Sequence, residues 1–401
     1  MVPELRRDFN SRFTEEKYQE KVRLLVEGTG HPIGFRICET PVFFSERLTR
    51  ELVEAVDEIV DQVTSPAYLQ EAERAIPPGL SVPGEDAFTT FLQVDFALVQ
   101  GEDGEIHPQL IELQGFPSVY AFQWLLDRVT REVDGIPAGL TTYFGGLDDA
   151  GYAACLREVI VGDCDPENVV LLEIDPLNQK TRVDFSVTER LLGVRPVDVR
   201  EVIERGGRLF YRQEGDGGKS SREVPIHRVY NRVIFDEMER RGLSLDPVFR
   251  RELDVHWVGH PNWFLKISKF TLPFLHGRYV PRSYFVSDLG EVPEDLENYV
   301  LKPLYSFAGL GVEMGVTAER LRAIDRPEHY ILQRRVEYAP LIETPDGGAK
   351  AEVRMMLVGK KGERPILINN LVRVSKGLMS GVDFNKDKTW IGASLGYHPL
   401  L

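Results

Sequence analysis

The 401-residue chain is poor in cysteine, in positive charge and in long apolar runs. Its three cysteines, Cys38, Cys155 and Cys164, form no CxxC pair, so neither a disulfide framework nor a structural zinc site is indicated. The 48 Lys and Arg residues face 63 Asp and Glu residues, which gives a formal net charge of −15. This balance argues against a nucleic-acid surface, because phosphate binding needs a dense positive footprint, although it allows a local basic pocket.

Targeting and membrane signals are also missing. The start, MVPELRRDFNSRF, has no apolar core of signal-peptide length, and no apolar run reaches the roughly 18 residues of a membrane span. We therefore expect a cytoplasmic protein without a membrane partner. Hydrophobic residues at 42% and charged residues at 28% are typical of a soluble globular chain, and this length predicts about two or three domains. Nothing in the sequence indicates an oligomeric state.

The first part of the chain, residues 1–84, is predicted to be mainly helical. In SERLTRELVEAVDEIVDQV the apolar positions 48, 52, 56, 59, 60 and 63 recur at helical spacing, which indicates an amphipathic helix. The Pro- and Gly-rich IPPGLSVPGED closes the region.

Three further segments follow. In residues 85–160, the strand-like runs FLQVDFALVQ and PQLIELQ flank the turn-rich GEDGEIH and predict a β-hairpin, after which residues 121–160 look helical. In residues 161–258, strands and helices alternate, which indicates a small α/β unit with a largely parallel sheet. In residues 259–401, a helix is predicted over HPNWFLKISKFTLPFLHG, and antiparallel strands with Gly-rich turns then predict an α+β unit.

The strand PQLIELQ ends in two polar side chains, Glu112 and Gln114. Residues i and i+2 of a strand point to one face, so both oxygens are expected to be aimed at the same spot. That spot is either a binding site or an ordinary solvated strand end.

A second stretch, NYVLKPLYSFAGLGVEMG, suggests an anion site. A strand delivers Lys302, and a loop of small residues follows, namely Ser306, Ala308, Gly309 and Gly311. Glycines let backbone N–H groups approach an anion closely, and the lysine adds a point charge. The alternative is a glycine-containing hairpin with a surface lysine.

Other cations flank this loop. Lys269 lies upstream in the predicted helix, and the apolar YILQRRVEYAP lies downstream. Arg354 and Arg373 follow on successive predicted strands. Several cations returning to one sheet face suit a bound triphosphate.

This order of features, together with the terminal NKDKTWIGAS, resembles the ATP-grasp ligases, in particular the circularly permuted branch related to glutathionylspermidine synthetase. In that branch, an Asp on one strand and Glu-x-Asn on the next bind magnesium and precede the nucleotide lysines. Asp95, Glu112 and Gln114 fall on these positions. Gln114 replaces the family's Asn with a side chain one methylene longer, which affects the binding of a second magnesium ion. Gln93 stands where an Arg is usual, which affects the rate of the family's reaction.

The resemblance covers residues 85–401 and implies a discontinuous ATP-grasp-like fold of the α+β and α/β classes. Residues 85–160 would supply the strand pair with the metal ligands, and residues 259–401 the nucleotide-binding part. The unit at 161–258 would be an inserted small α/β (pre-ATP-grasp) domain, and residues 1–84 a helical N-terminal region outside the resemblance.

The implied function is that of an ATP-dependent carboxylate–amine ligase, which forms a C–N bond through an acylphosphate with ATP and Mg²⁺. Its partners would be a small acid and a small amine. An alternative is a nucleotide-binding ATP-grasp-like protein without ligase activity.

The resemblance also implies roles for the remaining residues. Lys269 and Lys302 would hold the α and β phosphates, and the Ser306–Gly311 loop would cover the β/γ end. Arg354 would contact the transferring group, and Arg373 the acylphosphate or the substrate carboxylate. The stretch from Gln333 to Tyr338 would line the adenine and ribose, with Glu337 a candidate for the ribose hydroxyls.

Overall fold

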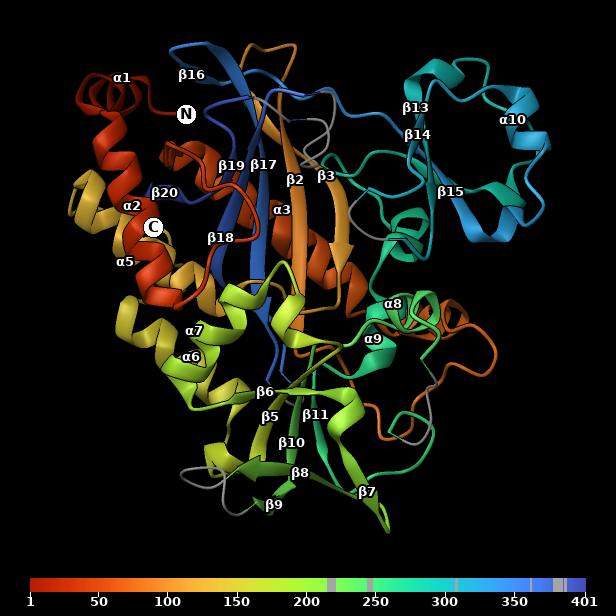
Figure 1. Ribbon diagram of the computed structural model, residues 1–401. Coiled ribbons are helices and arrows are strands. Elements are labelled where there is room, and N and C mark those ends of the chain that lie inside the picture. Colours follow the sequence, from red (N-terminus) through yellow and green to blue (C-terminus); the bar gives the residue numbers. More distant parts are fainter. Residues whose placement is uncertain (215–220, 244–247, 307–308, 361–362, 378–384, 386–387) are drawn as a thin grey trace.

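The computed structural model describes residues 1–214, 221–243, 248–306, 309–360, 363–377, 385 and 388–401. Figure 1 shows a tall central sheet with helices on its left, a small α/β unit below it and a separate lobe at the upper right. Among the described residues, no helix combines the length and the apolar character that crossing a membrane requires.

The N-terminal region is mainly helical, as predicted. Its helices are α1 (Pro3–Arg12), α2 (Glu15–Thr29), α3 (Glu46–Val63) and α4 (Pro66–Ala72). The predicted amphipathic helix is α3, which begins where the Ser45 side chain accepts a hydrogen bond from the N–H of Leu48. Its apolar face joins one continuous core with apolar side chains of the central sheet, including Leu52 with Val94 and Met355.

The central sheet combines strands from distant parts of the chain. They are β2 (Phe91–Gln100), β3 (Ile106–Gln114), β16 (Ile342–Thr344), β17 (Gly347–Val358), β18 (Ile366–Ser375) and β19 (Gly392–Ser394). Their order is β19-β18-β17-β2-β3, with β16 paired to β17, and all these pairs are antiparallel. The predicted hairpin is β2–β3. Because β2 pairs with β17, residues 91–100 lie beside residues 347–358.

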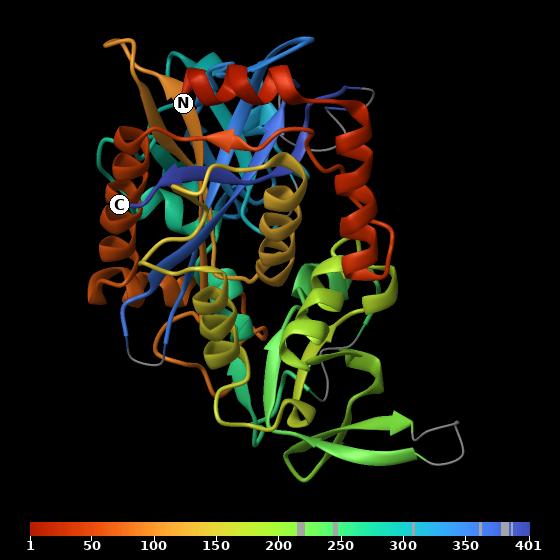
Figure 2. The same cartoon turned by 90° about the vertical axis from the view of Figure 1, so that its left-hand side faces the viewer.

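Helices α5 (Tyr120–Asp134) and α6 (Asp149–Ile160) confirm the helical prediction for the segment after the hairpin. A three-stranded sheet with the order β1-β20-β4 combines β1 (Val42–Phe43), β20 (Gly396–Pro399) and β4 (Leu140–Thr141). Figure 2 shows β1 and β20 running side by side, so the last strand is anchored to the N-terminal region.

The middle segment forms the predicted small α/β unit. Its parallel sheet has the order β11-β10-β5-β6, from β5 (Val169–Glu173), β6 (Arg195–Asp198), β10 (Arg228–Asn231) and β11 (His256–Val258). An antiparallel ribbon adds β7 (Ile203–Arg205), β8 (Arg208–Glu214) and β9 (Ser221–Ile226). The helices are α7 (Arg182–Leu192) and α8 (Phe235–Arg240).

The prediction of a single helix over 260–277 is wrong. The chain forms α9 (Pro261–Lys266) and a separate 3-10 turn (Lys269–Phe274). The break occurs because Ser268 is extended and caps the second turn, while the carbonyl of Ile267 accepts the N–H of Gly115 at 2.8 Å. The break places Lys269 at the start of the second turn.

The lobe at the upper right of Figure 1 confirms the predicted antiparallel character of the last segment. Its strands, in the order β12-β15-β13-β14, are β12 (Ser283–Phe285), β13 (Tyr299–Pro303), β14 (Glu313–Met314) and β15 (Tyr330–Arg334). Helix α10 (Ala318–Arg322) completes it. The predicted domain limits at 84, 160 and 258 stay predictions.

Candidate functional site

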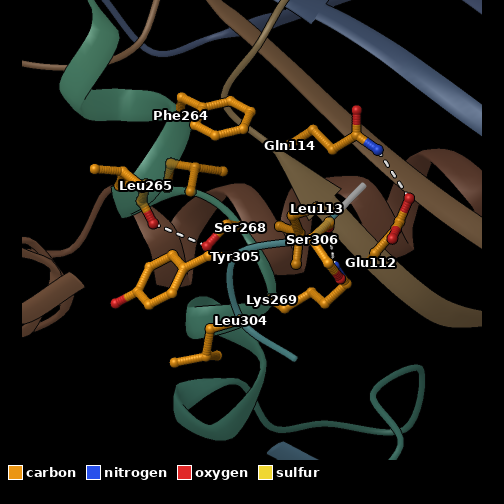
Figure 3. A pocket seen from close by; sticks show the side chains of 11 residues that line it. Glu112, Leu113, Gln114, Phe264, Leu265, Ser268, Lys269, Leu304, Tyr305 and Ser306 are labelled. Atoms are coloured by element: carbon orange, nitrogen blue, oxygen red, sulfur yellow. Dashed lines mark hydrogen bonds between the residues drawn. The ribbon is translucent and has the colours of Figure 1, made fainter. Parts of the chain in front are cut away.

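A hollow lies where β3 ends, between that strand, α9 and the segment after β13 (Figure 3). It holds about 460 Å³ of space, including its open mouth. Its lining residues are Glu112, Leu113, Gln114, Phe264, Leu265, Ile267, Ser268, Lys269, Leu304, Tyr305 and Ser306. The structure thus brings together four residues that sequence reasoning selected from three separate segments: Glu112, Gln114, Lys269 and Ser306.

Two buried lysines lie beside this hollow and make their hydrogen bonds to backbone and hydroxyl oxygens rather than to carboxylates. The Nζ of Lys302 donates to the carbonyl of Ile111 at 3.1 Å. The Nζ of Lys269 donates to the carbonyl of Ser306 and, at 3.2 Å, to its Oγ. Within the described part of the chain, neither lysine forms an ion pair with an Asp or Glu.

Burial makes both of these charges costly. It lowers the pKa of Lys302 to about 8; the charge of Glu112 opposes this change, and that of Lys269 adds to it. Burial also lowers the pKa of Lys269. Two desolvated ammonium groups whose charges act on each other favour a bound anion, which would add negative charge beside them.

The two polar side chains at the end of β3 share a face, as predicted. The Nε2 of Gln114 donates to Oε1 of Glu112 at 2.8 Å, which Figure 3 shows as a dashed line. The side chain of Glu112 is 25% exposed, and Oε1 lies 3.9 Å from Nη2 of Arg354. Glu112 is therefore a carboxylate that is open to the hollow and only loosely paired.

Behind these residues lies a buried network of charges. Both carboxylate oxygens of Asp95 accept hydrogen bonds from Arg354, at 2.7 Å from Nε and 2.6 Å from Nη2. Arg373 contacts both Asp95 and Glu352, and the hydroxyl of Tyr338 donates to Glu352 at 2.5 Å.

The register of the sheet produces this network. It places Asp95 opposite Arg354 and Glu352 opposite Arg373, so the four side chains lie on one face. Burial alone would raise the pKa of Asp95, but the guanidinium groups of Arg354 and Arg373 outweigh it and hold the pKa below its ordinary value. Asp95 is therefore ionised and held by arginines.

The metal and catalytic assignments stay predictions on this geometry. Among the described residues, no group of three or more His, Cys, Asp or Glu side chains is placed to hold a metal ion. Glu112 and Gln114 face the hollow, whereas Asp95 is bound by Arg354 and Arg373, neither of which lines it.

The glycine loop is described in part. Gly309 and Gly311 have φ values of +75° and +71°, in the left-handed region that favours glycine. Ala308 lies outside the described residues, as do residues 386–387 of the terminal NKDKTWIGAS.

None of the residues 333–338, which the resemblance assigns to the adenine and ribose, lines the hollow. Gln333 is buried in β15, and its Nε2 has no hydrogen-bond partner among the residues that are described. The side chain of Glu337 is 82% exposed and pairs with Arg335 at 2.8 Å.

Sequence reasoning missed several residues. Glu352 could have been found, because it lies two residues before Arg354 in a strand and therefore shares its face. The apolar wall of Phe264, Leu265 and Tyr305 carried no signal beyond its closeness in sequence to the two lysines.

Comparisons with known proteins bear on the fold. No protein-family model matches the chain, and no curated protein matches its sequence. The structure is similar to that of a glutathione synthetase-like effector from Globodera pallida, solved in its apo form, with a TM-score of 0.58. The sequences are 10% identical, and the match covers 96% of each chain. At this identity the similarity shows a mixed α/β fold of the glutathione synthetase-like type and nothing of the activity.

Proposed function

We propose that this protein is an ATP-dependent carboxylate–amine ligase of the ATP-grasp type that acts on a small acid and a small amine. One observation carries the proposal: the buried Lys269 and Lys302, which lack carboxylate partners within the described chain, adjoin a hollow that also presents Glu112 and Gln114. The likeness to a glutathione synthetase-like fold supports it.

The residues fit the phosphates of ATP. Two desolvated ammonium groups suit a polyphosphate, and the glycines at 309 and 311 would let backbone N–H groups approach it. Lys269 and Lys302 would hold the α and β phosphates, with the Ser306–Gly311 loop over the β/γ end.

The residues fit Mg²⁺ in part. This ion prefers hard oxygen ligands, and the Glu112 carboxylate and Gln114 amide provide them at the hollow. Asp95 could join them only if its hydrogen bonds to Arg354 and Arg373 were exchanged. When bound, Mg²⁺ would neutralise charge on the phosphates.

In the proposed reaction, a carboxylate oxygen of the acid attacks the γ-phosphorus of ATP, and ADP leaves. The amine nitrogen then attacks the acyl carbon, the C–O bond to phosphate breaks, and the amine loses a proton. Catalysis of phosphoryl transfer is mainly positioning and charge stabilisation, so the cations carry it. Arg354 would stabilise the transferring group and Arg373 the acylphosphate or the substrate carboxylate, with Gln333 and Glu337 at the adenine and ribose.

A second candidate function is ATP binding without ligation. It is favoured by the state of Asp95, whose two carboxylate oxygens are both occupied by guanidinium groups. In that case the nucleotide would order the lobes and no phosphoryl group would be transferred.

Release of ADP decides between the two functions. Purified protein is incubated with ATP and Mg²⁺ and with pairs drawn from amino acids, small peptides and polyamines, and the ADP and the amide product are measured. The ligase predicts ADP release that needs both an acid and an amine. Binding of ATP by calorimetry without ADP release would instead support the second function, and absence of ATP binding would contradict both.

A further inference from the structure

The turn at residues 115–119 leads directly out of β3, one residue after Gln114. Val119 has a φ of +57°, a left-handed conformation that is strained for a β-branched residue. A Cβ on Gly115 would lie 2.4 Å from the carbonyl oxygen of Trp263, so only glycine fits there. Such a strained and tightly packed turn needs other elements to hold its shape.

Side chains from three separate parts of the chain hold the turn and the start of the helix that follows it. The Nε2 of Gln93, on β2, donates to the carbonyl of Ser118 at 3.0 Å. The Oδ1 of Asp184, on α7, accepts the N–H of Phe122 at 2.9 Å at the start of α5. A third anchor is Arg232, which follows β10 in the small α/β unit and donates from Nη1 to the carbonyl of Pro117.

Arg232 is an unusual anchor. Arg232 is only 4% exposed. Its guanidinium lies over the rings of Phe116 and Phe185, at 5.0 and 5.4 Å from their centres. Its Nη2 contacts Thr181 Oγ1 at 3.4 Å, and within the described chain it forms no ion pair and its Nε has no hydrogen-bond partner. The buried carboxylates of Asp184 and Glu173 feel its charge without pairing with it directly, and its own hydrogen bonds go to the Pro117 carbonyl and to Thr181.

We propose that Arg232 is a positioning residue for the metal end of the site. By holding the Pro117 carbonyl, it fixes the turn and therefore the orientation of Gln114 and of Glu112, which are hydrogen-bonded to each other. This inference rests on the proposed function, because it assumes that Mg²⁺ and ATP meet at the end of β3. It also makes the small α/β unit a support of that site.

The chain provides a matched control in Arg6. This residue is also 4% exposed, donates from Nη1 to a proline carbonyl, that of Pro41, at 3.0 Å, and lies over Phe9 and Phe43 at 4.7 and 5.8 Å. It belongs to α1 and lines no part of the hollow. Arg6→Met therefore removes a comparable buried guanidinium without touching the turn.

The test compares the wild type with Arg232→Met, Arg232→Lys and Arg6→Met. Melting curves first establish that each variant is folded, and calorimetry then measures ATP binding with and without Mg²⁺. Partners that orient metal ligands typically contribute about 10- to 100-fold to metal affinity. We expect Arg232→Met to weaken ATP binding about tenfold with Mg²⁺ and to leave binding without Mg²⁺ within about twofold. Arg232→Lys keeps a charged hydrogen-bond donor and should lose less of the Mg²⁺-dependent ATP affinity. Arg6→Met should change the ATP affinity neither with nor without Mg²⁺.

Equal losses with and without Mg²⁺, or a match between Arg232→Met and Arg6→Met, would overturn the role of Arg232. If Arg232→Met does not fold, Arg232→Lys carries the test: a loss confined to the Mg²⁺-dependent affinity supports the role, and an unchanged or uniform affinity overturns it. A wild type that binds no ATP would instead contradict the proposed function itself.

Discussion

Lys302 should take up a proton when ATP binds. In the free protein, burial lowers its pKa from 10.5 to about 8, so near pH 8 about half of the molecules carry a neutral Lys302. A bound polyphosphate adds negative charge beside this ammonium group and should raise the pKa again. Binding at pH 8 is therefore expected to take up roughly half a proton per ATP.

The energy involved is considerable. A return of the Lys302 pKa from about 8 to its ordinary 10.5 corresponds to roughly 3 kcal/mol at 1.36 kcal/mol per pH unit. ATP affinity should accordingly fall by up to about tenfold per pH unit above pH 8. Lys302→Met removes the titrating group and should weaken binding by roughly 1.5–3 kcal/mol at pH 7.

Calorimetry in two buffers of different ionisation enthalpy measures the proton uptake. We expect it in the wild type at pH 8, little of it at pH 6.5, and much less of it at pH 8 in Lys302→Met. Lys360→Met, which removes a partly exposed lysine paired with Glu158, should behave like the wild type. ATP binding without proton uptake in the wild type, or with the same uptake in Lys302→Met, would refute the reasoning.

Two further predictions concern carboxylates. Glu112→Gln should keep nucleotide binding through the lysines but lose Mg²⁺-dependent ADP release by several orders of magnitude; near-normal release would remove Glu112 from the metal site. Burial raises the pKa of Glu173 to about 8, against an opposing effect of Arg232, so between pH 4.5 and 8 the folded state binds more protons than the unfolded state. Wild-type stability should therefore fall as the pH rises through that window, and Glu173→Gln should flatten this slope in chemical denaturation curves; an unchanged slope would contradict the assignment.

The sequence predicted features that depend on local patterns. The spacing of Leu48 to Val63 predicted α3, and strand alternation predicted that Glu112 and Gln114 share a face. Contacts between distant segments could not be read in this way. The break at Ile267 depends on its bond to Gly115, and the pairing of Asp95 with Arg354 depends on the register of β2 against β17.

The anchors of the 115–119 turn escaped prediction for the same reason. Arg232 follows a strand of another sheet, and nothing in its neighbourhood in sequence distinguishes it from a surface arginine. Only the packing of the small α/β unit against the turn brings its guanidinium to the Pro117 carbonyl.

A crystal structure of the protein with a non-hydrolysable ATP analogue and Mn²⁺ in place of Mg²⁺ tests the central claim most directly. We predict the polyphosphate within hydrogen-bond distance of Nζ of Lys269 and of Lys302, and an anomalous Mn²⁺ signal beside the carboxylate of Glu112. A crystal grown at a saturating concentration of the analogue in which the hollow is empty, or in which the nucleotide is bound elsewhere, would contradict the proposed site.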